Sequence, residues 1–478
     1  MTIRLDRPAP LAVTTVPWPS RPASPLGRAL LVAVNLAAVT SFLLSYGRHG
    51  IGFGQFRIDL DVYRIGGDVW LRHGDLYGAL PPTSNGVRLL FTYPPLAAVL
   101  LSPLSLVPMA LAGTVLSLAT VALTAVVLRL FLRSAAGPAA GSWWTIGWLL
   151  PVALLLEPVR HTLGYGQVNV LLMALVSADC LPARTRWPRG VLTGIAAAMK
   201  LTPAAFVLFF LCRGDRRAAA TATVTFAACG AAGFPLAWHD SARYWTSVVF
   251  QTGRPGSLVN AANQSIQAVL VRAGADPHAP AEVAGWLALS AVVVVLAWHG
   301  MRHALARSAD AWALSLNAFA ALLISPVSWS HHWVWAGPAL LVLAIDGARA
   351  RAAAGLAVFV AAPQWWFPTG ANREAHWAVW QQAVGASYVI LAASILLVSA
   401  CLAPAAGLRI PVSTDHRRVL ASSNISAPDS VRATLNNYGG LGSDRTGSQP
   451  GVGCRRTTRG QAAPRSAARF ARVAGPGR

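Results

Sequence analysis

The sequence predicts an all-α polytopic integral membrane protein. Of its 478 residues 55% are hydrophobic and only 12% are charged, about half the share of roughly 25% that is usual in soluble proteins. The mean hydropathy is +0.49. The apolar residues are grouped in runs near the ~20 residues that a helix needs to cross the hydrocarbon layer. Together these observations exclude an ordinary soluble protein.

The apolar runs form about twelve candidate membrane segments. Residues 1–28 precede them as a basic N-terminal extension that we expect to be cytoplasmic. Residues 404–478 follow as a basic tail rich in Ser, Gly and Pro, which we expect to be disordered and cytoplasmic. Residues 29–403 form the transmembrane domain. The candidate segments are residues 29–46, 89–107, 109–132, 143–159, 166–182, 190–211, 216–236, 284–301, 311–326, 333–346, 351–367 and 380–403.

Arginines in the connecting loops predict the orientation. Loops 213–217, 301–307 and 346–352 are basic and should be cytoplasmic by the positive-inside rule. Loops 47–88 and 237–283 then lie on the external side. Topology therefore explains the formal net charge of +22 better than nucleic-acid binding does.

Two arginine clusters leave the topology open. Clusters 129–133 and 183–189 fall outside if all twelve segments cross fully. They fall inside if residues 89–133 make one net crossing and residues 190–211 form a re-entrant pair. Prolines in both stretches make the second arrangement plausible, and loop 47–88 stays external in either.

The first external loop contains RIDLDVYRIGGDVW, residues 57–70. If this stretch is helical, Asp61, Arg64 and Asp68 share one face and form an ion-pair ladder. Asp59 and Tyr63 then share a different face. A solvated loop is the alternative, but the apolar residues between the charges favour a helix lying at the membrane interface.

Polar side chains at membrane depth are costly and therefore mark functional candidates. The stretch EPVRHTLGYGQVNVLL, residues 157–172, predicts either a network that links helices or a ligand site. Its candidate ligands are Arg160, His161, Gln167 and Asn169.

Lys200 is the only lysine in the chain and lies in an apolar stretch one turn before Pro203. A lysine can extend its ammonium group to the membrane surface, but the middle of a segment is a poor position for this. We therefore predict that Lys200 binds an anionic ligand.

Two external stretches add candidates. In SLVNAANQSIQAVL, residues 257–270, the amides of Asn263 and Gln264 suit sugar hydroxyls, which both donate and accept hydrogen bonds, although such residues are equally common in loops. In SPVSWSHHWVW, residues 325–335, His331 and His332 could donate to a phosphate. No carboxylate accompanies them at metal-ligand spacing, and the five cysteines show no CxxC. We therefore predict no metal site.

Six short motifs, in this order, resemble those of glycosyltransferase family 87. They are DLDVYR (59–64), FTYPPLAAVLLSPL (91–104), GQVN (166–169), KLTP (200–203), NQS (263–265) and SWSHHW (328–333). The resemblance covers roughly residues 29 to 403. Members of that family are actinobacterial mannosyltransferases of the GT-C type. They use polyprenol-phosphate-mannose to extend phosphatidylinositol mannosides, lipomannan and lipoarabinomannan.

The resemblance implies a GT-C fold with a catalytic aspartate in the first external loop, and Asp59 matches that position. It also implies single-displacement inversion, with Asp59 as general base and with Lys200, His331 and His332 as the favoured groups at the leaving phosphate. Arg64 and Arg160 are further candidates at the leaving phosphate. The other predicted substrate-binding residues are Tyr63, Tyr93, His161, Gln167, Asn169, Asn263 and Gln264.

The implied partners are a lipid-linked sugar donor, a mannoside glycolipid acceptor and membrane lipids, without a cofactor or nucleic acid. The implied reaction forms an α-1,2 linkage on the external, periplasmic face of the plasma membrane. The alternatives are a multi-pass transporter or flippase for a lipid or sugar, a non-catalytic scaffold or ligase of envelope lipids, and transfer of another polyprenol-linked sugar. Against a transporter, the two halves of the sequence lack matching broken helices of the kind that inverted repeats leave.

Overall fold

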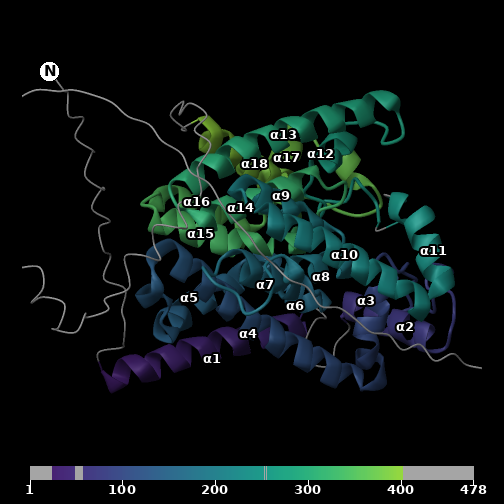
Figure 1. Ribbon diagram of the computed structural model, residues 1–478, viewed down its shortest axis with the longest axis horizontal. Coiled ribbons are helices and arrows are strands. Elements are labelled where there is room, and N and C mark those ends of the chain that lie inside the picture. The colour runs from purple at the N-terminus through teal and green to yellow at the C-terminus, as the bar shows by residue number, and fades with distance from the viewer. Residues whose placement is uncertain (1–23, 49–56, 252, 255, 402–478) are drawn as a thin grey trace, which may run out of the picture. The chain divides into compact units, whose positions relative to one another are not determined.

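The computed structural model describes residues 24–48 and 57–401 except 252 and 255. Within these ranges the chain is helical and contains no β-strand (Figure 1); its isolated bridge pairs Asn263 with Trp329. The predicted all-helical fold is confirmed to this extent. The tail at residues 404–478 and nearly all of the N-terminal extension lie outside the described residues, so the predictions made for them stay predictions.

The described elements are α1 (Pro25–Arg48), α2 (Ile58–Leu71), α3 (Pro95–Leu101), η1 (Ser102–Leu106), α4 (Met109–Ala136), η2 (Pro138–Gly141), α5 (Trp143–Leu155), α6 (Glu157–Tyr165), α7 (Asn169–Cys180), α8 (Val191–Met199), η3 (Thr202–Phe206), α9 (Val207–Arg213), α10 (Arg216–Leu236), α11 (Trp238–Thr246), η4 (Val248–Phe250), α12 (Ile266–Arg272), α13 (Pro280–Ala306), α14 (Asp310–Ile324), η5 (Ser330–Trp335), α15 (Ala336–Ile345), α16 (Arg349–Ala361), η6 (Pro363–Trp365), η7 (Arg373–His376), α17 (Val379–Gly385) and α18 (Ser387–Cys401).

Three described helices are long and apolar enough to cross a membrane, namely α4, α10 and α13. The number rises to five if each of two bent pairs forms one span: α6 with α7, bent by 119°, and α17 with α18, bent by 67°. Further apolar helices are only 10–17 residues long. Length and composition therefore support a membrane protein but do not confirm the predicted count of about twelve segments.

Several predicted segments are broken in the structure, and each break has a local cause. Helix α3 begins at Pro95, as the paired prolines predict, because proline fits the first helical position and disfavours a helical residue before it. The predicted segment 190–211 divides into α8, η3 and α9. Helix α8 ends at Met199, and the next residue, Lys200, has an extended backbone (φ −150°, ψ 131°) shortly before Pro203. The chain's lysine therefore lies at a helix break and not inside a helix.

Helix α2 is not one of the apolar helices named above, and it packs tightly against its neighbours. Gly67 is the contact point with η1, since a Cβ atom there would lie 2.7 Å from the Cα of Ser102. At the start of α2, the buried Arg57 side chain donates to the carbonyl of Gly113 and the hydroxyl of Ser117, both on α4. The helix that contains Asp59 is thus held at two points.

The ion-pair ladder predicted along α2 is only partly present. Arg64 lies 3.9 Å from Asp61, but Asp68 pairs with Arg72 at 3.0 Å instead. Asp61 accepts hydrogen bonds from the backbone and hydroxyl of Ser84 at 2.7 and 2.9 Å. The part of the prediction that joined Arg64 to Asp68 was wrong, because Arg64 bonds to η1 and the loop after it.

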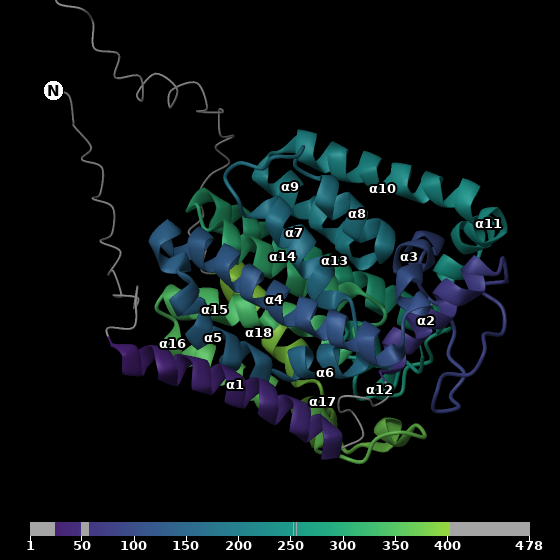
Figure 2. The ribbon, with the colours of Figure 1, turned by 90° about the horizontal axis from the view of Figure 1, so that it is seen from below.

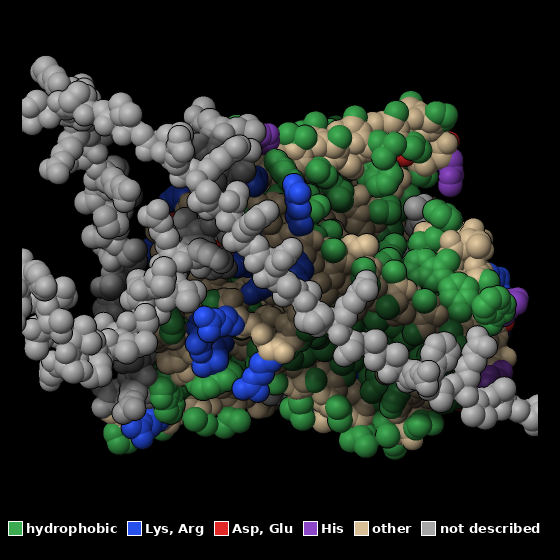
Figure 3. All heavy atoms as spheres, viewed as in Figure 1, with side chains coloured by type: hydrophobic (Ala, Val, Ile, Leu, Met, Phe, Trp, Pro, Cys, Tyr) green, Lys and Arg blue, Asp and Glu red, His purple; other side chains and the backbone are tan. Residues whose placement is uncertain are grey.

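Figures 1 and 2 both show α2, α3 and α11 grouped at one end of the helices, with α5, α15 and α16 toward the other. The main hydrophobic core joins these ends and includes Leu60, Phe131, Phe209, Leu316 and Trp333. On the face shown in Figure 3, most of the Lys and Arg side chains lie in the half away from α2, α3 and α11.

Both arginine clusters that left the topology open lie beside segments predicted to be cytoplasmic. Arg213 donates to the carbonyl of Cys180 at 2.9 Å and pairs with Asp310 at 3.5 Å, so cluster 183–189 lies near loops 213–217 and 301–307. The guanidinium groups of Arg28 and Arg129 stack over the adjacent rings of Trp144 and Trp143. These contacts favour the arrangement that places both clusters on one side with the N-terminal extension.

Candidate active site

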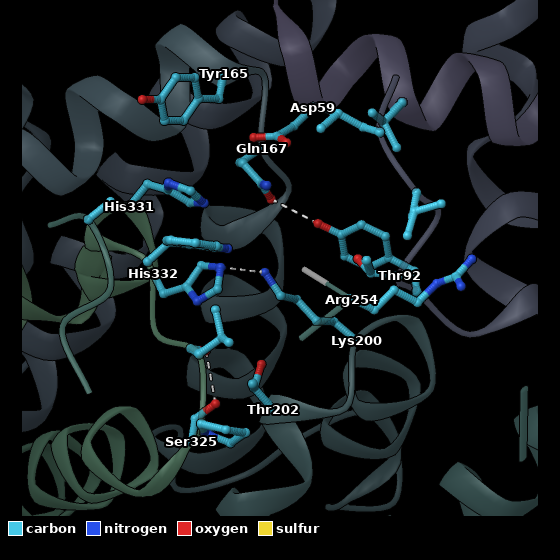
Figure 4. A pocket seen from close by; sticks show the side chains of 18 of the residues that line it. Asp59, Thr92, Tyr165, Gln167, Lys200, Thr202, Arg254, Ser325, His331 and His332 are labelled. Atoms are coloured by element: carbon cyan, nitrogen blue, oxygen red, sulfur yellow. Dashed lines mark hydrogen bonds between the residues drawn. The ribbon is translucent and has the colours of Figure 1, made fainter. Parts of the chain in front are cut away.

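A cavity of about 610 Å³ lies beside α2 and is bounded by segments from across the chain. Figure 4 shows that the side chains around it come from separate elements and face a common space. Its polar and ionisable lining residues include Asp59, Thr92, Tyr93, Tyr165, Gln167, Lys200, Thr202, Gln251, Arg254, Asn260, Ser325, His331 and His332. The sequence motifs, dispersed over some 270 residues of chain, thus meet at one place.

Asp59 is the only acid among the described residues that line this cavity. It lies in the first turn of α2, between the buried residues Arg57 and Leu60. Burial raises the pKa of its carboxyl group to about 6, while a hydrogen bond from Gln167 and the charge of Lys200 limit that rise. A carboxylate with a pKa near neutrality is suited to general-base catalysis.

Gln167 reaches Asp59 because the chain turns sharply between α6 and α7. Gly166 has φ +71°, in the left-handed region that favours glycine. A Cβ at this position would lie 2.7 Å from the Cβ of Leu60. The glycine of the GQVN motif therefore allows the turn to approach α2 and places Gln167 beside the acid.

Two tyrosines surround the Gln167 amide. The Tyr63 hydroxyl donates to Gln167 Oε1 at 2.7 Å, and the Tyr93 hydroxyl lies 3.4 Å from the same oxygen. The two hydroxyls are 3.0 Å apart. Tyr63 is fully buried and lies behind the cavity wall, whereas Tyr93 forms part of the lining.

Lys200 lies across the cavity from Asp59 (Figure 4). Its Nζ is 3.0 Å from Nε2 of His332 and 3.0 Å from Oδ1 of Asn169. It also lies 5.6 Å from the centre of the Tyr93 ring. Asn169 in turn donates to the carbonyl of His331 at 2.9 Å, so one amide positions both the lysine and the histidine pair.

His331 differs from its neighbour. Neither ring nitrogen of His331 has a hydrogen-bond partner among the described residues, although the residue is only 6% exposed. Its ring packs edge-on against Tyr165 and His332, with centroids 5.2 and 4.8 Å away. Because His331 lines the cavity, its ring nitrogens are available to a ligand or to water there.

Three basic residues among the predicted site residues also lie away from the cavity lining. Arg64 donates to the carbonyls of Leu104 and Val107 at 2.9 and 2.8 Å. Arg160 donates to the carbonyl of Val360. His161 lies 3.0 Å from the buried Glu157, and its ring packs at a tilt against Trp365 with the centroids 5.4 Å apart. These contacts give the three side chains structural partners.

The predicted amides of the NQS motif are also structural. Asn263 donates to Leu258 and Pro326 carbonyls and accepts from the backbone of Ser328. Gln264 donates to the carbonyls of Ala261 and Gly385. Both side chains are buried and hold in place the loop that contributes Asn260 and Ala262 to the cavity.

Several lining residues were not among the site residues predicted from the sequence. Arg254 donates to the carbonyls of Phe91 and Tyr77 at 3.0 and 2.9 Å. Trp365 lines the cavity and donates to Glu157 at 2.9 Å. Arg254 lies in a turn after η4, and Trp365 lies in the short helix η6 at the end of the predicted segment 351–367. Tyr165 had a usable signal, since it directly precedes the GQVN motif.

Within the described ranges, no group of three or more His, Cys, Asp or Glu side chains could hold a metal ion. The described site thus offers amides, hydroxyls, one carboxylate and two cations, Lys200 and Arg254. The absence of a metal and of a cofactor remains a prediction.

Comparison with known proteins identifies the family. The family model of glycosyltransferase family 87 matches residues 91–326. A "Polyprenol-phosphate-mannose-dependent alpha-(1-2)-phosphatidylinositol mannoside mannosyltransferase" of Mycolicibacterium smegmatis is 40% identical over 73% of this chain and 84% of its own length. The chain belongs to glycosyltransferase family 87. A protein of the same name from Mycobacterium tuberculosis is 38% identical over 79% of this chain and 90% of its own length.

More distant relatives bear a different acceptor in their names. A "Polyprenol-phosphate-mannose-dependent alpha-(1-2)-phosphatidylinositol pentamannoside mannosyltransferase" of Mycobacterium tuberculosis is 36% identical over 62% of this chain and 68% of its own length. No solved structure matches the chain.

The family 87 motifs coincide with the cavity. Five of the six motifs contribute a lining residue: Asp59, Tyr93, Gln167, Lys200 and the pair His331 and His332 are examples. The NQS motif contributes none and instead braces the adjoining loop. In this family 87 glycosyltransferase, the cavity is therefore the candidate active site.

Proposed function

We propose that this family 87 chain is an inverting mannosyltransferase of the GT-C type that transfers mannose from polyprenol-phosphate-mannose to a phosphatidylinositol mannoside, forming an α-1,2 linkage. The names of its relatives support the donor, the acceptor and the linkage. The observation that carries the proposal is the arrangement of one carboxylate, Asp59, opposite a lysine–histidine pair in a single cavity.

Asp59 acts as the general base. It accepts the proton of the acceptor hydroxyl while that oxygen bonds to the anomeric carbon of the mannose. The bond between that carbon and the phosphate oxygen breaks, and its electron pair stays on the phosphate. Attack from the face opposite the leaving group converts a β-linked donor into an α-linked product, and sugar transfer of this kind develops oxocarbenium character.

The cations opposite Asp59 bind the phosphate of the donor. Negative charge grows on this group as the glycosidic bond breaks, and preorganised donors at that position stabilise the transition state most. Lys200 supplies such a group and is held by the neutral His332, whose Nε2 accepts from it, and Arg254 adds a further cation to the lining. The unpartnered ring nitrogens of His331 contact the sugar or the phosphate of the bound donor.

The cavity opens on the external side of the plasma membrane, and the protein is multi-pass. Loop 47–88, which contains α2, is external in both topologies permitted by the sequence. Arginine side chains gather away from α2, α3 and α11 on the face in Figure 3, as the positive-inside rule requires if that half is cytoplasmic. Lipid-linked donors are accessible at that external position.

The function is tested by incubating membranes that contain the protein with radiolabelled polyprenol-phosphate-mannose and phosphatidylinositol mannosides. The expected product is an acceptor longer by one mannose. An α-1,2-specific mannosidase should release that added mannose. Transfer from a different polyprenol-linked hexose, or release of label only by an enzyme of another linkage specificity, would contradict the proposed donor or linkage. Movement of labelled lipid across vesicle membranes without transfer of mannose would contradict the proposed transferase activity and favour a transporter.

A further inference from the structure

We propose that Gln167 is a positioning residue that orients the carboxylate of Asp59 through its amide N–H group, and that Tyr63 and Tyr93 fix the direction in which this amide faces. The inference rests on the proposed role of Asp59 as general base. It assigns to Gln167 an action on the base in place of the direct substrate contact that the sequence predicted.

The tyrosines determine the orientation of the amide. A tyrosine hydroxyl has one proton to donate, and the amide oxygen is the acceptor end of a glutamine side chain. Tyr63 gives its proton to Oε1 at 2.7 Å. Tyr93 lies within hydrogen-bond distance of both Oε1 and the Tyr63 hydroxyl, at 3.4 and 3.0 Å. A reversed amide would take the Oε1 acceptor away from both hydroxyls and turn it toward the Asp59 carboxylate, which only accepts.

With Oε1 bound to the tyrosines, the Nε2 end is free to donate to the acid. Figure 4 shows the Asp59 carboxylate beside the Gln167 side chain, on the side away from the dashed bond that leaves the amide. The hydrogen bond from Gln167 to Asp59 acts to lower the pKa of the acid, against the effect of burial. The amide therefore favours the ionised form that can accept a proton.

The group is rigid. Gln167 is 4% exposed and Tyr63 is fully buried, so water does not readily replace either side chain. The backbone N–H of Gln167 donates to the carbonyl of Thr162 at 2.9 Å, which fixes the turn at Gly166. Tyr77 donates to the Tyr93 carbonyl at 2.7 Å and holds the second tyrosine.

The same group also contacts the opposite wall of the cavity. Lys200 lies 5.6 Å from the centre of the Tyr93 ring, so Tyr93 touches both the glutamine that orients the base and the lysine proposed to bind phosphate. A shift of the Tyr93 side chain would thus change the distance between Gln167 and Lys200. This arrangement gives Gln167, Tyr63 and Tyr93 a role in the geometry of the reaction and not only in packing.

The test compares Gln167→Met and Tyr63→Phe with the unmodified protein in membranes. Transfer is measured from pH 5 to 8 with saturating acceptor, giving kcat and the KM for polyprenol-phosphate-mannose. Because a hydrogen bond to a charged group is worth about 10- to 100-fold in an equilibrium, Gln167→Met should lower kcat by about that factor. The acid limb of its pH profile, which is the fall in kcat toward low pH, should move to higher pH. The KM for the donor should stay within about twofold.

Tyr63→Phe keeps the ring and removes the hydroxyl, so it should move the acid limb in the same direction by a smaller amount. It serves as the second variant if Gln167→Met does not fold. Gln381→Met is the matched control, because that glutamine caps α17 and is absent from the cavity lining. The control should leave both kcat and the acid limb unchanged.

Three results would overturn the inference: an unchanged kcat in Gln167→Met, a lower kcat with an unmoved acid limb, or a raised donor KM with kcat unchanged. The last result would make Gln167 a direct substrate ligand. Asp59→Asn measured in parallel separates this from the proposed function. If Asp59→Asn is inactive and the acid limb of Gln167→Met does not move, only the positioning role fails; if Asp59→Asn transfers normally, the general base itself is wrong.

Discussion

The ammonium nitrogen of Lys200 lies 3.0 Å from Nε2 of His332, and no described carboxylate forms an ion pair with this lysine. An ammonium group only donates hydrogen bonds, so His332 accepts from it through Nε2 and is neutral. Asn169 accepts a second of the three protons. The remaining donor and the positive charge are available to an anion in the cavity.

Replacing Lys200 should therefore weaken use of the phosphate-bearing donor. Hydrogen bonds to charged groups are worth about 1.5–3 kcal/mol, so Lys200→Met should lower kcat/KM for polyprenol-phosphate-mannose by about 10- to 100-fold. Lys200→Arg should recover part of the loss because it keeps the charge. The exposed Arg88 lies outside the cavity lining, and Arg88→Met should change kcat/KM little. Equal losses of kcat/KM in Lys200→Met and Arg88→Met would argue against a specific phosphate contact.

The rate of transfer should depend on pH through Asp59. Its pKa of about 6 means that the acid is mostly protonated at pH 5 and mostly ionised at pH 7. A general base must be ionised, so kcat/KM should rise over this interval. The test is a pH profile of transfer with Asp68→Asn as control, since Asp68 pairs with Arg72 away from the cavity. A profile that is flat from pH 5 to 7 would contradict the assignment.

The same pKa makes a prediction about stability with the opposite dependence on pH. Burial raises the folded-state pKa of Asp59 from an ordinary value of 3.8 to about 6, so the folded protein holds this proton more tightly than the unfolded chain. The contribution of Asp59 to stability is then most favourable below pH ~4 and is lost as pH rises through ~6. Asp59→Asn should therefore raise the Tm relative to the unmodified protein more at pH 7.5 than at pH 4.5. Equal differences at the two values would contradict the raised pKa.

Close packing of α2 predicts a second stability effect. Gly67→Ala would place a Cβ 2.7 Å from backbone at Ser102, and overpacking of this kind costs about 1–3 kcal/mol. The variant should have a lower Tm and also lower transfer, because α2 contains Asp59. Gly285→Ala on α13 is the control, since nothing lies within 4 Å of a Cβ at that position. Thermal unfolding in detergent that shows the same Tm for both variants would rule out the tight contact.

The sequence alone was enough to predict the centre of the site because its residues are conspicuous. Asp59, Gln167, Lys200 and His332 are polar side chains in or beside apolar runs, where an unsatisfied polar group is costly. The structure brings all four to one cavity. The helical period also predicted correctly that Asp61 and Arg64 face each other on α2.

The contacts that the sequence did not predict depend on tertiary position. Helical spacing cannot show that the carbonyls of Leu104 and Val107 lie beside Arg64 and draw it away from Asp68. Arg254 enters the cavity from a turn and Trp365 from the three-residue helix η6, and neither element is long enough for periodicity to indicate a direction. The bend of 119° between α6 and α7 follows from the turn at Gly166, which a hydropathy pattern does not show.

The most direct measurement of the central claim is transfer of mannose by Asp59→Asn. Asparagine has nearly the same shape but cannot accept the proton of the acceptor hydroxyl. Membranes that contain equal amounts of the unmodified protein, Asp59→Asn and Asp68→Asn are incubated with radiolabelled polyprenol-phosphate-mannose and phosphatidylinositol mannoside. The account predicts that Asp59→Asn folds but loses transfer by a factor of about 100 or more, while Asp68→Asn keeps it. Normal transfer by Asp59→Asn would contradict the assignment of this carboxylate as the base.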